Sequence, residues 1–278
     1  MYKKKTFFLF CAPAYIAFLI FMIVPTISGL VYAFTDWNGI KVTQFVGLSN
    51  FERVFKDQYF LDSIWFTTKM AVLGIICSNV MGFFLALLTT SKLKGTVFFR
   101  SAYFVPNLIT GLVLGYFWQY IFLYLFPLLG LPNLLVDSFG GLIALTIMET
   151  WQRGGYLMLL YIAAIQNIPK ELNEAAEVDG AGYLQRLRHI IWPMVAPAFT
   201  SATFITLTGA FKGFDNNFSL TMGGPFRSTE MIALNIYNTA FKENMYGYTQ
   251  AKAIVYLLMI VVITSIQLYF TKRREVEM

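Results

Sequence analysis

The residues whose types suit chemistry at a protein surface gather in one polar stretch, Asn167 to His189, which lies between two strongly apolar segments. Within it, Glu174 can offer a carboxylate to an arginine of a partner, and a hydrogen bond between charged groups is roughly twice as strong as one between neutral groups. The small side chains of Ala175 and Ala176 allow the backbone to approach a partner closely. These residue types indicate a segment to which another protein binds.

Two short helices must position these residues. Pro169 favours a helix start because its missing N–H costs nothing there, and Glu171 suits the positive end of the helix dipole. Gly180 and Gly182 stand where a left-handed turn ends a helix at little cost. The face at helical spacing carries Leu172, Ala175, Ala176 and Asp179. The stretch therefore predicts a helix, a turn and a second short amphipathic helix over residues 183–187.

The pattern of residues 167–189 is equally compatible with a solvated loop whose amphipathic face packs against its own protein, because short amphipathic helices are common. The residue types alone leave docking and self-packing open. His189, the single histidine of the chain, stands at the mouth of the next apolar run and is interpreted as an interface residue.

The composition excludes several classes of protein. Of 278 residues, 57% are hydrophobic and 13% are charged, and the mean hydropathy is +0.61, which predicts a membrane protein. Cys11 and Cys77 lie inside apolar runs, so neither a disulfide framework nor a metal site is expected, and no catalytic residue is assigned. The basic residues are dispersed and form no nucleic-acid patch. Because no GxxxxGK[ST] sequence occurs, any ATP must be hydrolysed by another chain.

Six apolar runs are long enough to span a membrane. Their predicted bounds are roughly 7–34, 64–90, 102–125, 140–165, 190–214 and 251–270. The first run is too long for a signal peptide and lacks a cleavage site of small residues. Basic residues concentrate on the side of the polar stretch, so this stretch and both termini are predicted to be cytoplasmic. The chain is divided into residues 1–63, the first span and an outer loop, and residues 64–278, a core of five helices.

A segment between the last two spans is predicted to lie outside the cell. The sequence from Thr221 to Pro225 predicts a turn, and residues 229–241 predict a short helix that Thr229 could cap. Its apolar positions, expected to lie on the membrane surface or on a partner, are Met231, Leu234, Ile236 and Phe241.

The polar stretch resembles a known family motif. Glu174-Ala175-Ala176 is followed after three residues by Gly180, after nine more by Ile190, and then, beyond one residue, by Trp192-Pro193. This spacing resembles the EAA loop in membrane subunits of bacterial ATP-binding-cassette (ABC) importers. The fuller sequence from Glu174 to Ala181 resembles the carbohydrate-uptake branch, the permeases of maltose, maltodextrin and related sugars. Trp192 departs from the family, which usually has leucine there, and this departure leaves the docking interpretation intact.

Outer segments extend the resemblance from Asp36 to the C-terminus. These segments are Asp36-Trp37-Asn38-Gly39, Val46-Gly47-Leu48-Ser49-Asn50-Phe51 and Thr221-Met222-Gly223-Gly224-Pro225. In the family, the last of these, followed by a short helix, marks a subunit that pairs with a second, different permease.

The resemblance implies an all-α membrane protein, a type I ABC importer permease with six transmembrane helices in the bacterial inner membrane, which forms half of the pathway for a sugar or oligosaccharide. An anionic sugar derivative or sugar phosphate is the alternative substrate. The implied partners are a second permease, two ATPase subunits that bind ATP and magnesium, and an extracytoplasmic binding protein, with no cofactor on this chain. The family's coupling helix corresponds to the polar stretch, so the expected ATPase contacts are Glu174, Ala175, Ala176, Asp179, Gly180 and Ala181. An intramembrane enzyme or a self-gated channel has little support, because their motifs are missing from the sequence.

A substrate path is expected on the fourth and fifth predicted spans. Arg153 lies near mid-bilayer, where an unpaired charge facing lipid costs at least about 2.5–3.5 kcal/mol, so it must face a partner or a cavity. Pairing with Glu149, four residues earlier on the same helical face, is the alternative to a role in binding. Aromatic rings stack on sugars, while amide and basic groups bind hydroxyl groups or a carboxylate. The assigned residues are Trp151, Gln152, Arg153, Tyr156, Phe211 and Lys212, of which the resemblance favours Tyr156 and Phe211 first.

Overall fold

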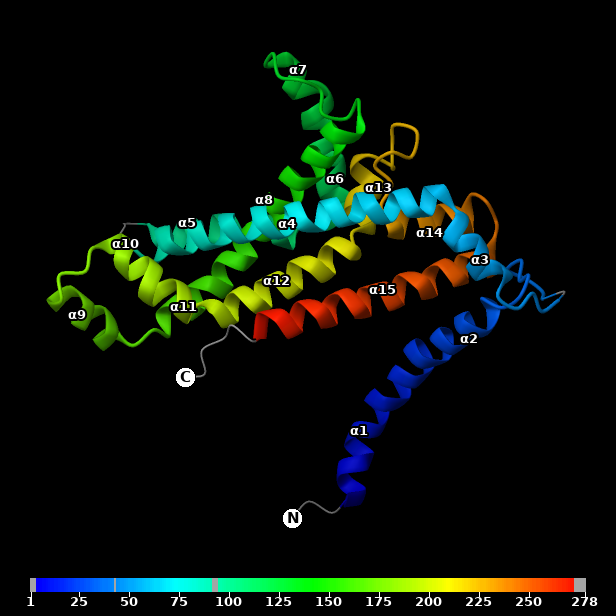
Figure 1. The fold of residues 1–278 in the computed structure, drawn as a ribbon, viewed down its shortest axis with the longest axis horizontal. Helices are drawn as coiled ribbons and strands as arrows, with labels where there is room; N and C mark the ends of the chain where they lie inside the picture. The colour runs from blue at the N-terminus through cyan, green and yellow to red at the C-terminus, as the bar shows by residue number, and fades with distance from the viewer. Residues whose placement is uncertain (1–3, 43, 92–94, 273–278) are drawn as a thin grey trace. The chain divides into compact units, whose positions relative to one another are not determined.

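The structure, a computed structural model, describes residues 4–42, 44–91 and 95–272. Regular structure in these ranges is helical, apart from one antiparallel bridge between Thr35 and Phe45 (Figure 1). The α-helices are α1 (Lys4–Phe18), α2 (Val24–Tyr32), α3 (Ser49–Lys56), α4 (Gln58–Thr90), α5 (Thr96–Phe104), α6 (Gly111–Tyr120), α7 (Phe126–Leu128), α8 (Ser138–Gln166), α9 (Lys170–Val178), α10 (Tyr183–Arg186), α11 (Trp192–Met194), α12 (Ala196–Phe211), α13 (Phe214–Leu220), α14 (Ile232–Phe241) and α15 (Tyr246–Lys272). Wider π-helical turns cover Leu19–Ile23, Ile121–Leu125 and Leu187–Ile191, and a 3-10 turn covers Val105–Leu108. The predicted all-α class is confirmed.

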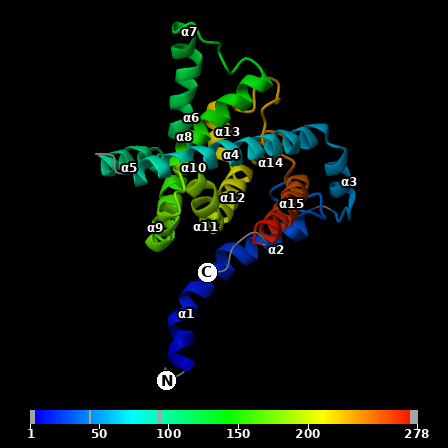
Figure 2. The ribbon, with the colours of Figure 1, turned by 60° about the vertical axis from the view of Figure 1, so that its left-hand side comes forward.

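The chain forms two compact units. One comprises Met1–Phe60 with Ile236–Leu258, and the other comprises Leu61–Asn235 with Met259–Met278. In the second unit, α9 follows the C-terminal end of α8, whereas α13 packs beside the middle of α8, where Asn216 lies within hydrogen-bond distance of Glu149 and Gln152 (Figure 1 and Figure 2).

The first unit is held together by a buried ion pair. The ammonium of Lys252, on α15, lies 2.8 Å from a carboxylate oxygen of Asp57, and the side chain of Lys252 is only 1% exposed. Tyr248 donates a hydrogen bond of 2.7 Å to Asp57, and Lys252 donates one of 2.9 Å to the hydroxyl of Thr239. Burial alone would raise the pKa of Asp57, but the hydrogen bonds from Lys252 and Tyr248 and the charge of Lys252 outweigh it, so the pKa is lowered from 3.8.

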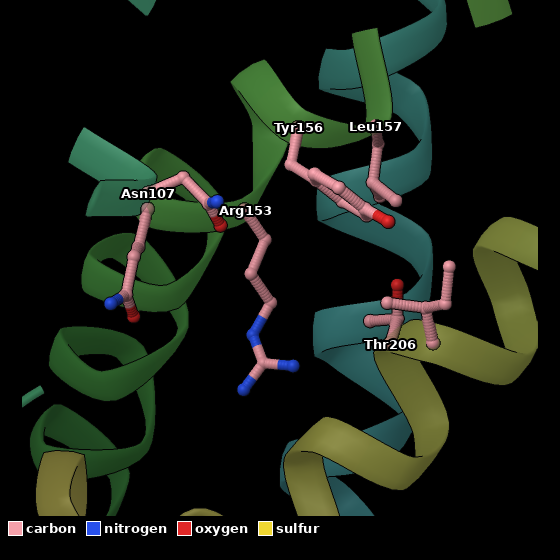
Figure 3. A pocket seen from close by; sticks show the side chains of 7 residues that line it. Asn107, Arg153, Tyr156, Leu157 and Thr206 are labelled. Atoms are coloured by element: carbon pink, nitrogen blue, oxygen red, sulfur yellow. The ribbon is translucent and has the colours of Figure 1, made fainter. Parts of the chain in front are cut away.

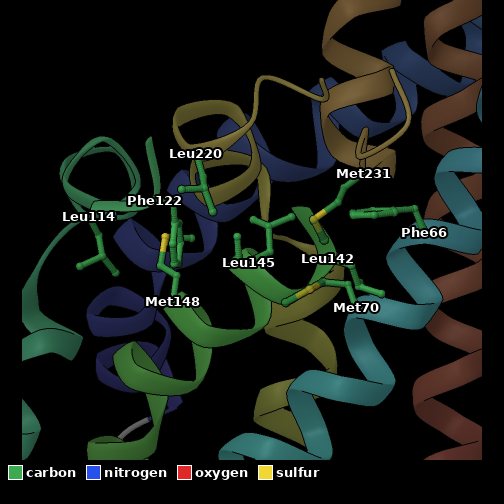
Figure 4. Packing of buried hydrophobic residues seen from close by; sticks show 10 residues of the cluster. Phe66, Met70, Leu114, Phe122, Leu142, Leu145, Met148, Leu220 and Met231 are labelled. Atoms are coloured by element: carbon green, nitrogen blue, oxygen red, sulfur yellow. The ribbon is translucent and has the colours of Figure 1, made fainter. Parts of the chain in front are cut away.

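The second unit has an apolar core between α4, α6, α8 and α13. Its fully buried side chains include Met70 of α4, Leu114 of α6 and Leu145 of α8. Figure 4 shows these side chains converging with Leu220 and Met231. The tight packing of this cluster fixes which face of α8 turns toward α6 and α13.

A second cluster packs another part of α8 against α4 and α12. It includes Ala86 of α4, Leu157 and Tyr161 of α8, and Ala202 of α12. The hydroxyl of Tyr161 donates a 2.7 Å hydrogen bond to Asn79, which satisfies the one polar group of an otherwise apolar contact. Together the two clusters hold α8 at the centre of the second unit.

Four helical segments among the described residues are long and apolar enough to cross a membrane. They are Phe7–Tyr32, Gln58–Thr90, Gly111–Leu128 and Tyr246–Thr271. A fifth candidate consists of Tyr183–Met194 and Ala196–Phe211, which meet at an angle of 64°. The protein is therefore a multi-pass membrane protein. The remaining predicted span corresponds to α8, whose centre carries Glu149, Gln152 and Arg153 and is less apolar for that reason.

Two predicted spans have different bounds in the structure. The third was expected over residues 102–125, but α5 ends at Phe104 and the apolar helix restarts at Gly111. Pro106 lies in the intervening 3-10 turn and cannot donate the backbone hydrogen bond that a continuous helix needs. The fifth was expected to be continuous from residue 190, but the chain bends at Val195, between Pro193 and Pro197.

The predicted cap of the outer helix was wrong. The hydroxyl of Thr229 donates to the carbonyl of Gly224, and α14 begins only at Ile232. The free N–H groups at its start donate instead to side chains of other elements, that of Met231 to Asn217 and that of Ile232 to Thr67. Met231 and Leu234 are buried, so this part of the segment belongs to the protein core and does not lie on the membrane surface.

Candidate functional site

The polar stretch forms the predicted helix, turn and second helix. α9 ends in a left-handed turn at Gly180, whose φ is +77°. The N–H of Ala181 donates to the carbonyl of Ala176 at 2.8 Å, and the N–H of Gly180 donates to that of Glu177 at 3.1 Å. This paired pattern satisfies carbonyls that the helix end leaves open, and the positive φ explains why glycine stands there.

The second glycine was predicted to be left-handed as well, and that prediction was wrong. Gly182 has φ −69°, and its N–H donates to the side chain of Gln185 at 2.8 Å, which starts α10. An ion pair between Glu177 and Arg186 then links α9 to α10. The turn is thus closed by hydrogen bonds and one charge pair, which gives the loop a defined shape.

The six residues predicted to contact an ATPase all lie on this loop. Four of them, Ala176, Asp179, Gly180 and Ala181, line a shallow pocket of about 320 Å³ together with Gln185, Arg186, His189 and Ile190. Glu174 and Ala175 lie exposed on α9. The described residues also leave Val178 87% exposed and Leu184 75% exposed. Self-packing of the loop against its own chain is therefore not what the structure shows.

A cavity of about 330 Å³ lies between α8, α12 and the 3-10 turn before α6. Its lining comprises Asn107, Gln152, Arg153, Tyr156, Leu157, Ile205 and Thr206. Figure 3 shows the guanidinium of Arg153 extending into the space that Asn107, Tyr156 and Thr206 surround. The cavity combines a cation, two amides, a hydroxyl and a phenol ring, a set that can bind a polyhydroxylated molecule.

Arg153 both pairs with Glu149 and lines the cavity. Pairing with Glu149 and facing a cavity, which the sequence left as alternatives, therefore occur together. Its Nε lies 3.6 Å from a carboxylate oxygen of Glu149, whose side chain is 0% exposed, whereas that of Arg153 is 19% exposed. This Nε and that oxygen lack hydrogen-bond partners among the described residues. A Cβ built on Gly209 of α12 would overlap the guanidinium. Because glycine has no side chain, the surface of α12 at this position has room for the guanidinium of Arg153.

Amide hydrogen bonds hold the rest of the polar lining in place. Gln152 donates to the carbonyl of Ile109 at 3.1 Å and accepts from Asn216 of α13 at 3.2 Å. The same amide of Asn216 lies 3.4 Å from Glu149. The cavity is thus connected through buried polar groups to both α13 and the turn before α6.

The structure brings three of the six predicted substrate-path residues together at the cavity, namely Gln152, Arg153 and Tyr156. Trp151 instead packs on the apolar core, with its ring 5.6 Å from that of Trp118. Phe211 is buried outside the cavity lining, and Lys212 lies exposed at the end of α12. These three lie outside the cavity because α8 and α12 turn other faces toward it.

Sequence patterns did not indicate the other four lining residues, namely Asn107, Leu157, Ile205 and Thr206, or Asn216, which supports the lining. Asn107 was assigned to the interior of a span, although the preceding Pro106 was a signal for a break there. Thr206 carried no signal, because a threonine within an apolar helix usually bonds its own backbone, and this one does donate to Ala202. Among the described residues, no group of three or more His, Cys, Asp and Glu side chains could hold a metal ion.

Comparison with known proteins identifies similar transport components. Residues 78–276 match the family described as "Binding-protein-dependent transport system inner membrane component". The chain is 44% identical over 292 aligned positions, covering 100% of both chains, to the probable starch degradation products transport system permease protein AmyD of Thermoanaerobacterium thermosulfurigenes. It is 31% identical to the multiple sugar-binding transport system permease protein MsmF of Streptococcus mutans, over 93% of this chain and 92% of that one.

The fold is similar to that of a solved transporter. One chain of a bacterial ABC transporter involved in the import of the acidic polysaccharide alginate superposes with a TM-score of 0.85 at 22% sequence identity, covering 97% of this chain and 96% of that chain. The same kind of transporter, in complex with a periplasmic protein bound to an alginate pentasaccharide, gives a TM-score of 0.83 at 23% identity. At these identities the likeness establishes the fold.

Proposed function

Since the chain belongs to the family of binding-protein-dependent transport system inner membrane components, we propose that it forms half of the translocation pathway of a type I ABC importer for short oligosaccharides derived from starch. The cavity between α8 and α12 carries this proposal, because its amides, hydroxyl, phenol ring and cation suit a polyhydroxylated ligand. The names of the similar permeases AmyD and MsmF support a sugar substrate and do not favour the anionic alternative.

Six spans with cytoplasmic termini are part of the proposal. At about 1.5 Å per residue, the 29 residues of α8 extend about 43 Å, which exceeds the roughly 30 Å of a bilayer core. Adding α8 to the four apolar segments and the bent pair gives six. The division into residues 1–63 and 64–278 remains a prediction. A cysteine at Gly224 should react with an impermeant reagent from outside, and a cysteine at Gly182 should not; the opposite labelling would reverse the topology.

We further propose that α9 and its turn dock onto a separate ATPase subunit, which binds the ATP and magnesium. Support comes from the exposed Glu174 and Ala175, the shallow pocket beside them and the closed shape of the turn. The complete importer would contain a second permease, two ATPase copies and an extracytoplasmic binding protein. The cavity and the docking loop would then be coupled through α8, which ends just before α9 begins.

The test is ATP hydrolysis by the complete complex reconstituted in liposomes. Maltose or maltotriose with the binding protein should stimulate hydrolysis, whereas an unrelated sugar should not. Glu174→Ala should lower stimulated hydrolysis and uptake about 10-fold or more, because a hydrogen bond to a charged group contributes about 1.5–3 kcal/mol. Glu171→Ala, which removes another exposed acid of α9, is the matched control. Equal activity of both variants would mean that Glu174 does not couple, and stimulation by no saccharide would reject the substrate class.

The geometry of the turn gives a second variant. Gly180→Pro cannot adopt φ +77° and removes an N–H that donates to Glu177, so coupling should be lost while the complex still assembles. Co-purification of the ATPase and uptake should be measured together. Normal uptake by this variant would exclude a role for the turn.

A further inference from the structure

An apolar groove of about 560 Å³ is separate from the cavity beside Arg153 and from the shallow pocket beside Gly180, with which it shares no lining residue. Its lining comprises Trp192, Pro193, Ala196, Phe199, Thr200, Phe270 and Thr271. The groove crosses the 64° bend at Val195, with α11 on one side of the bend and α12 on the other. Its second wall is the end of α15, which Gln267 ties to α12 through a 3.5 Å hydrogen bond to the carbonyl of Thr200. Its volume lies within the range of about 300–1,000 Å³ found for small-ligand sites.

The groove is aromatic but only partly closed. The ring of Trp192 is held edge-on against Phe83 at 5.4 Å and lies 5.7 Å from that of Phe199, so its orientation is fixed by its own helix bundle. Trp192 and Phe270 nevertheless remain 48% and 63% exposed. A fixed, half-exposed tryptophan beside an apolar slot is typical of the membrane interface, where the ring lies at headgroup level. This also gives a role to the residue at which the chain departs from the leucine expected after the loop.

Positive charge flanks the groove at one end. The N–H of Trp192 donates a hydrogen bond to the carbonyl of Leu187 and so closes the π-helical turn Leu187–Ile191. Because a π-helical turn is wider than an α-helical one, Arg188 lies about one turn before Trp192 and Pro193, on the same side of the helix. On the other wall, Thr271 is followed in the sequence by Lys272, Arg273 and Arg274. Arg188 is exposed and therefore places a positive charge beside the end of the groove that α11 forms.

We propose that this groove binds a phospholipid with an anionic headgroup, with one acyl chain lying across the bend and the headgroup beside Arg188. The apolar slot accounts for the acyl chain, and Arg188 accounts for the headgroup, because a basic residue at the end of an apolar helix attracts anionic lipids. A lipid in this position would support the bend that joins α12 to the docking helices. The proposal rests on the proposed function only in placing this end of α12 on the cytoplasmic side.

The experiment measures lipid contact and does not depend on transport. The complete complex is placed in nanodiscs that contain either brominated phosphatidylglycerol or brominated phosphatidylcholine in a fixed background of unlabelled phosphatidylcholine. The contribution of Trp192 to the fluorescence is isolated as the difference between the unaltered complex and Trp192→Phe. Trp192 should be quenched by the anionic lipid at a severalfold lower mole fraction than by the zwitterionic one.

Two charge variants complete the test. Arg188→Gln should reduce the preference about fivefold, which is the effect of one basic residue near an anionic surface. Lys170→Gln, which removes an exposed cation of α9 that does not line the groove, should retain the preference. Equal quenching by both lipids, an equal loss in both charge variants, or no quenching of Trp192 by either lipid would overturn the proposal, the last result indicating that another protein segment covers the groove. A complex that transports normally without any lipid preference would leave the proposed function intact while rejecting this site.

Discussion

Each compact unit contains an ion pair with a buried side chain, Lys252 with Asp57 in one and Arg153 with Glu149 in the other, and the two pairs differ in how completely their polar groups are satisfied. Lys252 and Asp57 lie 2.8 Å apart, and Tyr248 and Thr239 complete their hydrogen bonds. Arg153 and Glu149 lie 3.6 Å apart, and the facing nitrogen and oxygen lack hydrogen-bond partners among the described residues. The Lys252 pair thus has further hydrogen bonds to protein side chains, whereas Arg153 of the second pair lines a cavity.

The difference indicates two uses of the same chemistry. A buried polar network in which every group is paired rigidifies a fold, and removal of one member leaves an uncompensated charge. A pair that retains unused hydrogen-bonding capacity beside a cavity can direct that capacity to a ligand. We therefore expect the Lys252 pair to control stability and the Arg153 pair to control substrate transport.

The largest effect is expected from Lys252→Met. Removing one partner of a buried ion pair typically costs about 3–5 kcal/mol, because the other charge stays buried. The thermal unfolding midpoint of the purified complex should fall well below that of Lys242→Met, a matched control at an exposed lysine of the same unit. Equal midpoints for the two variants would break the comparison, because the Lys252 pair would then not stabilise the fold.

A smaller effect, on transport, is expected from Arg153→Gln. Loss of a hydrogen bond to a charged group costs about 1.5–3 kcal/mol, which corresponds to about 10- to 100-fold in apparent substrate affinity. Uptake and substrate-stimulated ATP hydrolysis should both show it, whereas Lys242→Gln should not. If Arg153→Gln lowers only the unfolding midpoint and leaves apparent affinity unchanged, the cavity pair is structural like the other one.

Gly209→Ala should act through Arg153. The added methyl group would overlap the guanidinium, and overpacking of this kind costs about 1–3 kcal/mol, part of which displacement of Arg153 relieves. Uptake should therefore decrease, but the double variant Gly209→Ala, Arg153→Gln should be no worse than Arg153→Gln alone. Additive losses in the double variant would show that the two residues act independently.

The smallest effect concerns pH and the Lys252 pair. Because the pKa of Asp57 is lowered in the folded protein, Asp57 stabilises the fold above its unfolded pKa near 3.8, and this contribution is lost as the pH falls through the lower folded value. The unfolding midpoint should decrease more steeply in this acidic range for the unaltered protein than for Asp57→Asn. Parallel pH curves for the two proteins would contradict the assignment.

Local sequence was sufficient to predict the class of the protein and the helix, turn and second helix within residues 167–189. Long apolar runs predict membrane helices, because each segment in a bilayer must satisfy its backbone hydrogen bonds within itself. The distribution of basic residues predicts the orientation of these helices. The turn at Gly180 could be predicted because a left-handed helix end depends on one residue and its neighbours. Gly182 shows the limit of this reasoning, since a competing side-chain hydrogen bond from Gln185 decided its conformation.

Only the tertiary structure decided which side chains share the cavity. Trp151 and Gln152 are adjacent in sequence, yet the turn of α8 sends the first into the core beside Trp118 and the second to the cavity. That choice depends on how α8 packs against α4, α6, α12 and α13, and no single segment encodes it. The room that Gly209 leaves on α12 is likewise apparent only once Arg153 from another helix lies there. The sequence by itself determined that the chain forms long apolar helices and a left-handed turn at Gly180, which are local properties, whereas the cavity beside Arg153 arises from contacts between helices far apart in the chain.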